Sequence, residues 1–425
     1  MRKTAFTTTL AALLAFLPLT SLAQDLAITH AEAWTMAGAD GGKISDATVI
    51  VRNGRIVSVT AAGAVPQGAT VIDAAGRMVT PGLMNGATQL GLVETGAAQE
   101  TNDKTSTNTT LGASFDIQYA LNNNSVLLPV ARADGLTRAV SYPGAAGIAP
   151  FMGQAATIHL TETGDILEKP QAALYVQIGS ATLSAAGGSR SAQWQLLRNA
   201  LTEAGRYKPG LPDEPISRLD AEALQKVLKG QLLVILTQRE SDIRQAIALA
   251  KDFRLRVAVM GADEAWRCAD ALAAAKIPVI LDPMDNLPIS FDQIGARLDN
   301  AALLGKAGVT MSFYASGNTI YLSYDAGEAM REVAGMAVAN GLPYADGLAA
   351  MTIGPAAIFG LSDHYGTLAK DQDADIVIWD GDPLEPGTYP WKVFVQGQEA
   401  SLETRQTLLR DRYIRPTGLP PVYQK

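Results

Sequence analysis

The stretch VTPGLMNGATQLGLVE, residues 79 to 94, follows a part of the chain whose sequence pattern predicts strands and precedes a part with a different pattern. Before it, DATVIVRNGRIVSVT predicts two alternating strands around Asn53-Gly54, a pair that suits a type I′ turn because both residues tolerate positive φ. The segment ATVIDAAGRMVTPG predicts a second short hairpin, which leads into the stretch itself. The chain up to residue 80 is therefore expected to be rich in strands.

From about Leu232 onward, short apolar runs alternate with amphipathic segments. LLVILT precedes SDIRQAIALAKDF, RVAVMG precedes ADEAWRCADALAAA, and IPVILDP and VTMSFYA precede further helical segments. Apolar runs followed by amphipathic helices are typical of strands buried on both faces, and so of a parallel sheet or barrel. TRAVSY, ATIHL and AALYVQIG supply strand candidates upstream, although the count does not by itself fix eight units.

The last part of the chain again predicts short strands, as the first part does. DADIVIWDGDPL and KVFVQGQEA are short β runs separated by Gly, Asp and Pro. Between the first strands and the alternating part, QETNDKTSTNTTLGA (99 to 113) is a polar run. Long loops after barrel strands often carry substrate contacts, and a simple solvated connection is the alternative.

The composition restricts the class of protein. The chain has 425 residues, of which 48% are hydrophobic and 18% charged, so it can bury one large core or two modest ones and is not disordered. The formal net charge is -8, and no run of Lys or Arg follows the pattern of a phosphate-binding segment. Nucleic acid is therefore not an expected partner.

The first residues predict export. Arg2 and Lys3 precede an apolar run from about Leu10 to Leu19, and Ser21-Leu22-Ala23 then has the small-x-small pattern of a signal-peptidase site. We expect a signal peptide over 1–23 and a mature chain with no membrane span, periplasmic if the source is a Gram-negative bacterium. An uncleaved anchor is the alternative, but the apolar run is too short to span a bilayer. The single cysteine, Cys268, is expected to be buried rather than reactive.

Two segments carry a resemblance to a known family. VIDAAGRMVTPGLMNGATQLGL resembles the passage of amidohydrolase-superfamily enzymes from a β-sandwich into the first barrel strand, and MTIGPAAIFGLSDHYGTLAKDQDADIVIWDGDPLE (351 to 385) resembles their return to it. The run from 241 to 281 is similar to the imidazolonepropionase-like branch. The resemblance implies an α/β fold, a TIM-type (β/α)8 barrel over 81–359 with a small composite β-sandwich formed by 24–80 and 360–425.

The resemblance also implies hydrolysis of a carbon–nitrogen bond by metal-bound water, but the positions of the family's ligands hold other residues here. Its His-x-His pair falls on Ala87 and Gln89, its next His on Leu236, a further His on Asp263, and its catalytic Asp on Ser316. Ala and Leu have no donor atom, and a Gln amide oxygen is a weak, neutral ligand. No acidic residue occurs between residues 300 and 324, so a small shift in register supplies no replacement for Ser316.

The remaining candidates are few. Asp263 and Glu94 are weak candidates for catalytic acid and base, with helix capping as the alternative for Asp263 and an exposed position as that for Glu94. The three histidines, His30, His159 and His364, occupy no ligand position, and no two of them have the spacing of a metal motif. Each is expected to be an ordinary hydrogen-bonded or exposed histidine.

Two hypotheses follow. In the first, the protein is an exported pseudo-enzyme without a cofactor, which binds a small molecule or an intact amidohydrolase paralogue, and an oligomer is possible. In the second, it is a divergent hydrolase of carbon–nitrogen bonds in non-peptide or cyclic amides, with a divalent cation such as zinc or manganese. The residues at the ligand positions favour the first.

Overall fold

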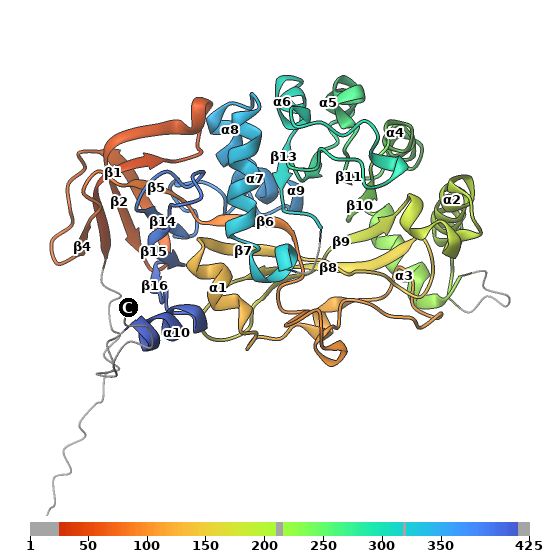
Figure 1. Ribbon diagram of the computed structural model, residues 1–425, viewed down its shortest axis with the longest axis horizontal. Helices are drawn as coiled ribbons and strands as arrows, with labels where there is room; N and C mark the ends of the chain where they lie inside the picture. The colour runs from red at the N-terminus through yellow and green to blue at the C-terminus, as the bar shows by residue number, and fades with distance from the viewer. Residues whose placement is uncertain (1–24, 210–215, 318–319, 415–425) are drawn as a thin grey trace, which may run out of the picture.

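We describe residues 25–209, 216–317 and 320–414 of a computed structural model (Figure 1). The expected signal peptide, residues 1–23, lies outside the described residues. Within those ranges no helix is both long and apolar enough to cross a membrane. Cys268 is buried, as predicted, and burial raises the pKa of its thiol to about 11.

The first of two sheets joins the two ends of the chain, and Figure 1 shows red and blue strands side by side in it. Strand β5 pairs with β1 on one side and with β14 on the other, so the ends meet there. This arrangement confirms a composite sandwich. Its strands are β1 (Leu26–Trp34), β2 (Lys43–Arg52), β3 (Arg55–Ala61), β4 (Thr70–Asp73), β5 (Met78–Pro81), β14 (Ile376–Trp379), β15 (Pro390–Val395) and β16 (Gln398–Ala400).

The two predicted turns of this region have different outcomes. The β2–β3 hairpin turns at Asn53 and Gly54, with φ angles of 51° and 75°, which confirms the type I′ prediction. The second predicted hairpin is wrong, because β4 and β5 pair separately with β1, in parallel and one after the other. The turn at Ala75 and Gly76 shifts the chain along β1 instead of reversing it. Turn residues specify local dihedral angles, whereas the choice of partner strand depends on tertiary packing.

The second sheet forms the barrel, with its strands in the order β6 to β13 around the sheet. Strand β8 runs antiparallel to both β7 and β9, and the chain passes through these three strands without a helix, whereas all other neighbouring pairs are parallel. The strands are β6 (Leu83–Thr88), β7 (Leu136–Ser141), β8 (Phe151–His159), β9 (Leu167–Gln177), β10 (Leu232–Thr237), β11 (Val257–Gly261), β12 (Val279–Leu281) and β13 (Met311–Phe313).

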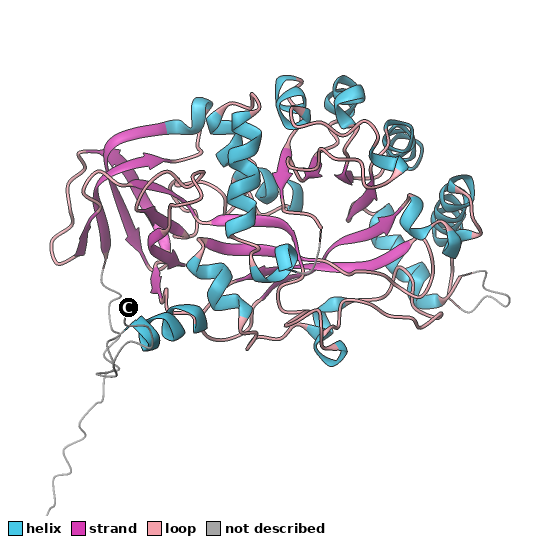
Figure 2. Cartoon of the chain, in the orientation of Figure 1, coloured by secondary structure: helices cyan, strands magenta, loops and turns pink. Residues whose placement is uncertain are grey.

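Helices cover the outer face of the parallel part of the barrel, a short helix lies beneath β7, and loops and short turns lie beneath β8 (Figure 2). Helix α4 is representative, since it buries Ile243, Ala246 and Leu249 at helical spacing against the sheet. The helices are α1 (Leu127–Ala133), α2 (Arg190–Arg206), α3 (Arg218–Leu228), α4 (Glu240–Phe253), α5 (Ala269–Ala275), α6 (Asn300–Lys306), α7 (Glu328–Ala339), α8 (Tyr344–Ala349), α9 (Ile353–Phe359) and α10 (Arg405–Ile414).

The barrel closes along a seam between its edge strands β6 and β13. A Cβ atom at Gly86 would lie 2.2 Å from Oγ of Ser312, so only glycine permits this approach. The seam is bridged by the segment before α9, in which Met351 O accepts from the Met84 amide (2.8 Å) and Ala350 O accepts from the Phe313 amide (3.0 Å). The nearly closed barrel confirms the predicted fold class.

A buried charge cluster joins the base of the barrel to the sandwich. The guanidinium of Arg138 in β7 donates to Glu168 Oε1 (2.7 Å), to Asp373 Oδ2 (2.6 Å) and to Asp375. Burial alone would raise the pKa of Asp375, but the charge of Arg138 and a contact with His159 hold it at about 2. The side chain of Arg138 in the barrel thus positions the sequence Asp373-Ala374-Asp375, where the chain returns to the sandwich.

We expect Arg138→Met to lower the free energy of unfolding by about 3 to 5 kcal/mol, because it leaves buried carboxylates without their cation. The matched control is Arg55→Met, which removes a guanidinium that also contacts Asp373 (3.2 Å) but is exposed to water. That change should lower the free energy by less than about 1 kcal/mol. Denaturant unfolding at pH 7 measures both, and equal effects would contradict the role assigned to Arg138.

Candidate functional site

The interior of the barrel is filled by apolar and aromatic side chains. Tyr142 and Tyr175 stack there with ring centroids 5.3 Å apart, and Tyr314 is buried in the same cluster. Burial raises the pKa of all three phenols well above the ordinary value, so they remain neutral. The cluster also contains Met84, Val140, Met152, Val234, Met260 and Ile280 from the surrounding strands.

The resemblance places metal-binding histidines at four positions of this chain, and two of these positions belong to the apolar cluster. Ala87, at the end of β6, is fully buried in it, and Leu236, near the end of β10, packs against it. Neither side chain has an atom that can bind a cation. Side chains that the resemblance places around a metal are instead part of the barrel's hydrophobic filling.

Gln89 follows β6, and its side chain is hydrogen-bonded to the ammonium group of Lys104. Its Oε1 accepts from Lys104 Nζ at 3.0 Å, and its backbone amide donates to Leu322 O at 2.7 Å. Lys104 comes from the polar run 99–113, and partial burial lowers the pKa of its ammonium. The amide oxygen that could have served as a metal ligand therefore faces an ammonium group.

Carboxylates gather at the carboxyl ends of β11 and β12. Asp263 follows β11, Asp282 follows β12 directly, and Asp285 lies three residues further on. Ser316, after β13, links the last two, since its amide donates to Asp282 Oδ2 (2.6 Å) and its hydroxyl donates to Asp285 Oδ2 (2.9 Å). We call Asp263, Asp282 and Asp285 the mouth carboxylates.

The mouth carboxylates hold protons more tightly than ordinary aspartates. Burial, and then repulsion by Asp285, raises the pKa of Asp263 to about 7. The same two causes raise the pKa of Asp282 to about 6 against the opposing hydrogen bonds from Ser316 and Met284. Burial also raises the pKa of Asp285. Buried carboxylates that repel one another keep their protons to a higher pH than exposed aspartates do.

Sequence reasoning missed Asp282, Asp285 and Lys104. Asp282 could have been found by the rule that selected Asp263, because each comes just after a buried strand whose end faces the barrel mouth. The residues around Ser316 in the sequence include no acidic group. The acidic groups that contact Ser316 come instead from the end of the preceding strand.

The alternative reading of Asp263 as a helix cap is wrong. The backbone amide of Trp266, at the start of the next helical turn, donates to Asn300 Oδ1 (3.0 Å) and not to Asp263. Asp263 is buried, interacts with Gln293, and its Oδ2 accepts no hydrogen bond from the described residues. An unpaired buried carboxylate oxygen is unusual and is consistent with a protonated or ligand-facing group.

Glu94 lies apart from the mouth carboxylates in its contacts. Its two oxygens accept from Asn122 Nδ2 (2.9 Å) and from the Val126 amide (3.2 Å), which precedes α1. The structure thus gives Glu94 a role in holding the loop before α1, and its contacts do not include Asp263.

Each of the three histidines contacts a carboxylate away from the mouth carboxylates. His30 is exposed and bonded to Asp46 (2.9 Å), which raises its pKa. His159 and His364 belong to the charge cluster at the base of the barrel, where His159 contacts Asp375 (3.4 Å) and His364 contacts Glu168 (3.5 Å). These contacts agree with the expectation of ordinary histidines.

The residues present do not fit the divalent cation that the family's chemistry implies. Among the described residues, no group of three or more His, Cys, Asp or Glu side chains is arranged to hold a metal ion. Ala87 and Leu236 offer no donor atom, and Gln89 is bonded to an ammonium. The side chains at the positions where the resemblance places metal ligands thus do not form a metal site within the described residues.

A nearly closed barrel with polar groups at its strand ends, joined to a sandwich whose strands come from both ends of the described chain, is the fold that the resemblance to amidohydrolases implies. Comparison agrees: the model of the amidohydrolase family matches residues 267–407. The chain is therefore similar to the amidohydrolase family over this part, which is about a third of its length.

Known relatives and structures resemble the chain to different extents. A curated amidohydrolase, tasK of Hapsidospora irregularis, is 44% identical over 57 residues, which are 13% of this chain and 6% of that protein. The match thus spans a small part of that relative. The crystal structure of an amidohydrolase from Thermotoga maritima MSB8 superposes with a TM-score of 0.78 at 22% identity, covering 88% of this chain and 99% of that one.

A second structure, N-isopropylammelide isopropylaminohydrolase from Burkholderia multivorans ATCC 17616, gives a TM-score of 0.51 at 16% identity, covering 88% of this chain and 98% of that one. At such identities the two structural likenesses establish the fold alone.

We expect Asp263→Asn to raise the free energy of unfolding at pH 8 and to change it little at pH 4. Because the folded pKa of about 7 exceeds the ordinary 3.8, the bound proton stabilises the folded state below about pH 4, and this contribution is lost as the pH rises to 7. Asn stays neutral throughout, so the gain at pH 8 is at most about 4 kcal/mol.

Denaturant unfolding at pH 4, 6 and 8 measures this difference. Asp270→Asn, on the exposed side of α5, is the control and should leave the pH dependence of stability unchanged. A gain for Asp263→Asn that is equal at pH 4 and pH 8 would show that Asp263 is not the titrating group.

Proposed function

We propose that this protein is an exported, non-catalytic member of the amidohydrolase superfamily that uses the barrel as a binding scaffold. The single observation that carries the proposal is the packing of Ala87 and Leu236, two positions for ligand residues, within the apolar filling of the barrel. The sequence pattern of residues 1–23 supports export.

The chemistry of the family's reaction depends on what these positions lack. A bound divalent cation lowers the pKa of a water molecule by many units, and each unit corresponds to about 1.4 kcal/mol. The ammonium of Lys104, held 3.0 Å from Gln89 Oε1, repels a cation from the end of β6. Mouth carboxylates that bind protons near neutral pH offer no substitute Lewis acid.

As a scaffold, the protein would bind either a small molecule at the loops of the barrel mouth or an intact amidohydrolase paralogue as a subunit. Its acidic balance and the absence of a basic run in the sequence argue against nucleic acid as a partner. Neither role requires a cofactor.

One observation favours the divergent hydrolase as a second candidate. Asp263 is buried, has a pKa of about 7 and carries an oxygen without a hydrogen-bond donor among the described residues. A carboxyl group with these properties is suited to transfer a proton in general acid–base catalysis of amide hydrolysis. This candidate requires a chemistry in which Asp263 acts as the proton carrier.

Elemental analysis tests the first proposal. Protein expressed from the full coding sequence with zinc, manganese and iron supplied should retain less than about 0.1 equivalent of any of them after desalting. Lys104→Met is the matched variant, and it should also stay metal-free because Ala87 and Leu236 still provide no donor. About one equivalent of metal in the wild-type protein would overturn the proposal.

Activity assays separate the two candidates. A panel of N-acyl amino acids and cyclic amides should give no turnover above the uncatalysed rate. If turnover is found, the hydrolase candidate requires that Asp263→Asn lower it by at least about 100-fold, whereas Glu94→Gln, which changes a loop contact, serves as the comparison. Turnover that survives Asp263→Asn would exclude the role assigned to Asp263.

A further inference from the structure

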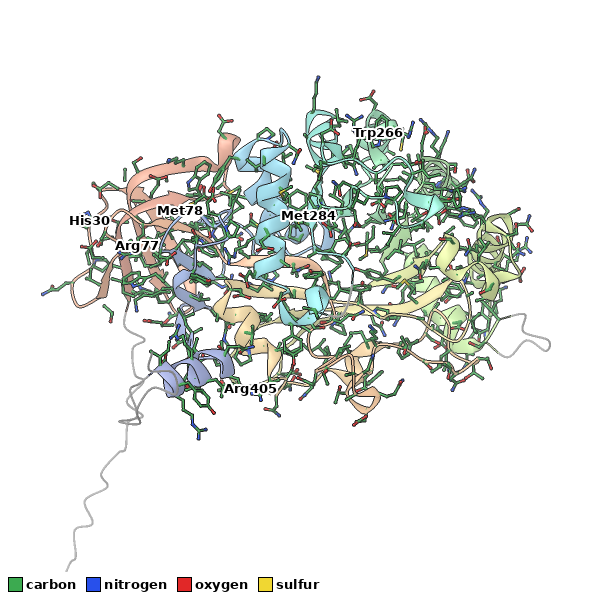
Figure 3. All side chains as sticks on the ribbon, viewed as in Figure 1. His30, Arg77, Met78, Trp266, Met284 and Arg405 are labelled. Carbon is green, nitrogen blue, oxygen red and sulfur yellow. The ribbon has the colours of Figure 1, made fainter. Side chains whose placement is uncertain are left out.

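The loop after β12 exposes an unusual amount of apolar surface. Five large apolar side chains between residues 284 and 294 are open to solvent, namely Met284 (46%), Leu287 (73%), Ile289 (88%), Phe291 (88%) and Ile294 (62%). Figure 3 labels Met284 in the middle of the molecule, away from the sandwich, on which His30 and Arg77 are labelled. We call these five residues the mouth patch, since a loop that follows a barrel strand lies at the barrel mouth.

The loop is anchored through its polar residues. Asp282 Oδ1 accepts from the Met284 amide (2.8 Å), and Asp285 accepts from the hydroxyl of Ser316 (2.9 Å). Further along, Asp292 is buried, accepts from the Ser180 amide (2.7 Å) and pairs with Arg190. Polar side chains thus face inward and apolar ones outward, which is the reverse of an ordinary surface loop.

The size of the mouth patch approaches that of a protein interface. A bare large apolar side chain presents roughly 150 to 200 Å², so the five residues expose on the order of 500 to 700 Å². That is at the upper end of the largest patch on a typical monomer, about 300 to 600 Å². A standard interface buries about 800 Å² on each partner, so this patch with a modest rim is sufficient.

The chemistry of the mouth patch favours a copy of itself as the occupant. Residues 281 to 296 contain no Lys or Arg, and the carboxylates of Asp282, Asp285 and Asp292 are engaged within the protein. A neutral apolar surface can meet its own symmetry mate without repulsion between like charges. An anionic membrane surface is disfavoured, because such binding relies on basic residues beside the apolar ones.

We infer that two copies of this chain associate through their mouth patches to form a symmetric dimer. The two barrel mouths then face each other, with Ile289 and Phe291 near the two-fold axis. The inference does not depend on the proposed lack of catalysis, since the loop's exposure and anchoring are the same in either case.

Sedimentation velocity of the protein expressed from the full coding sequence tests this inference. Between 1 and 50 µM, roughly the range in which interfaces of this size associate, we expect a dimer. The double variant Ile289→Ser/Phe291→Ser should weaken association at least tenfold, whereas the matched control Val71→Ser, on the exposed edge of the sandwich, should leave it unchanged. A monomeric wild-type protein, or a dimer that persists in the double variant, would overturn the inference.

Cross-linking tests the symmetry. The native Cys268 is buried, so Ile289→Cys introduces one accessible thiol per chain, and a short bismaleimide should link two chains in this variant but not in Val71→Cys. A dimer in which Ile289→Cys gives no link would place the interface elsewhere. A monomer that sediments with vesicles of phosphatidylglycerol, or that dimerises only with an added amidohydrolase, would assign the mouth patch to those partners instead.

Discussion

The arrangement of the two sheets depends on the buried ion pairs between the guanidinium of Arg138 and the carboxylates of Asp373 and Asp375. Through Asp375 and Asp373 the guanidinium fixes the start of β14, and the carbonyl oxygen of Asp375 in turn accepts from the Gly82 amide (2.8 Å). Gly82 lies where the chain leaves β5 for the barrel, and its own carbonyl accepts from the Tyr365 hydroxyl. One buried cation thus positions both passages between sandwich and barrel, and the first barrel strand begins from that point.

The two ends of the barrel contrast in their electrostatics. At the base, each buried carboxylate has a cation, and the pKa of Asp375 is held low. At the mouth, Asp263, Asp282 and Asp285 have no ion pair within the described part of the chain, and their pKa values rise. Between these ends lies an apolar filling with three neutral phenols. The mouth carboxylates therefore keep their protons to a higher pH than the carboxylates at the base.

The sequence allowed much of the fold to be predicted, because alternation, turn residues and apolar runs are local signals. The helices after β10, β11, β12 and β13 and the Asn53-Gly54 turn follow from such signals. Pairing partners and strand direction do not, since an apolar run such as that of β8 reads the same in either direction. For this reason the pairing of β4 with β1 was not predicted, and neither was the antiparallel course of β8, which departs from the strand–helix alternation of a (β/α)8 barrel.

The candidate site was predicted in part for the same reason. Positions on known strands, such as Ala87 and Asp263, could be located by counting. The contact of Lys104 with Gln89 could not, because Lys104 lies in an irregular polar run whose path across the barrel end has no periodic signature. Asp282 and Asp285 reach Ser316 from a different strand end, and neighbourhood in space is not visible as neighbourhood in sequence.

The apolar packing around Ala87 has a consequence for any attempt to introduce a metal ligand at this position. A histidine introduced there would bury an imidazole among methionine and tyrosine side chains, and by itself it would bind nothing, because a catalytic cation needs several ligands at once. A single histidine at this position would therefore lower stability without creating a metal site.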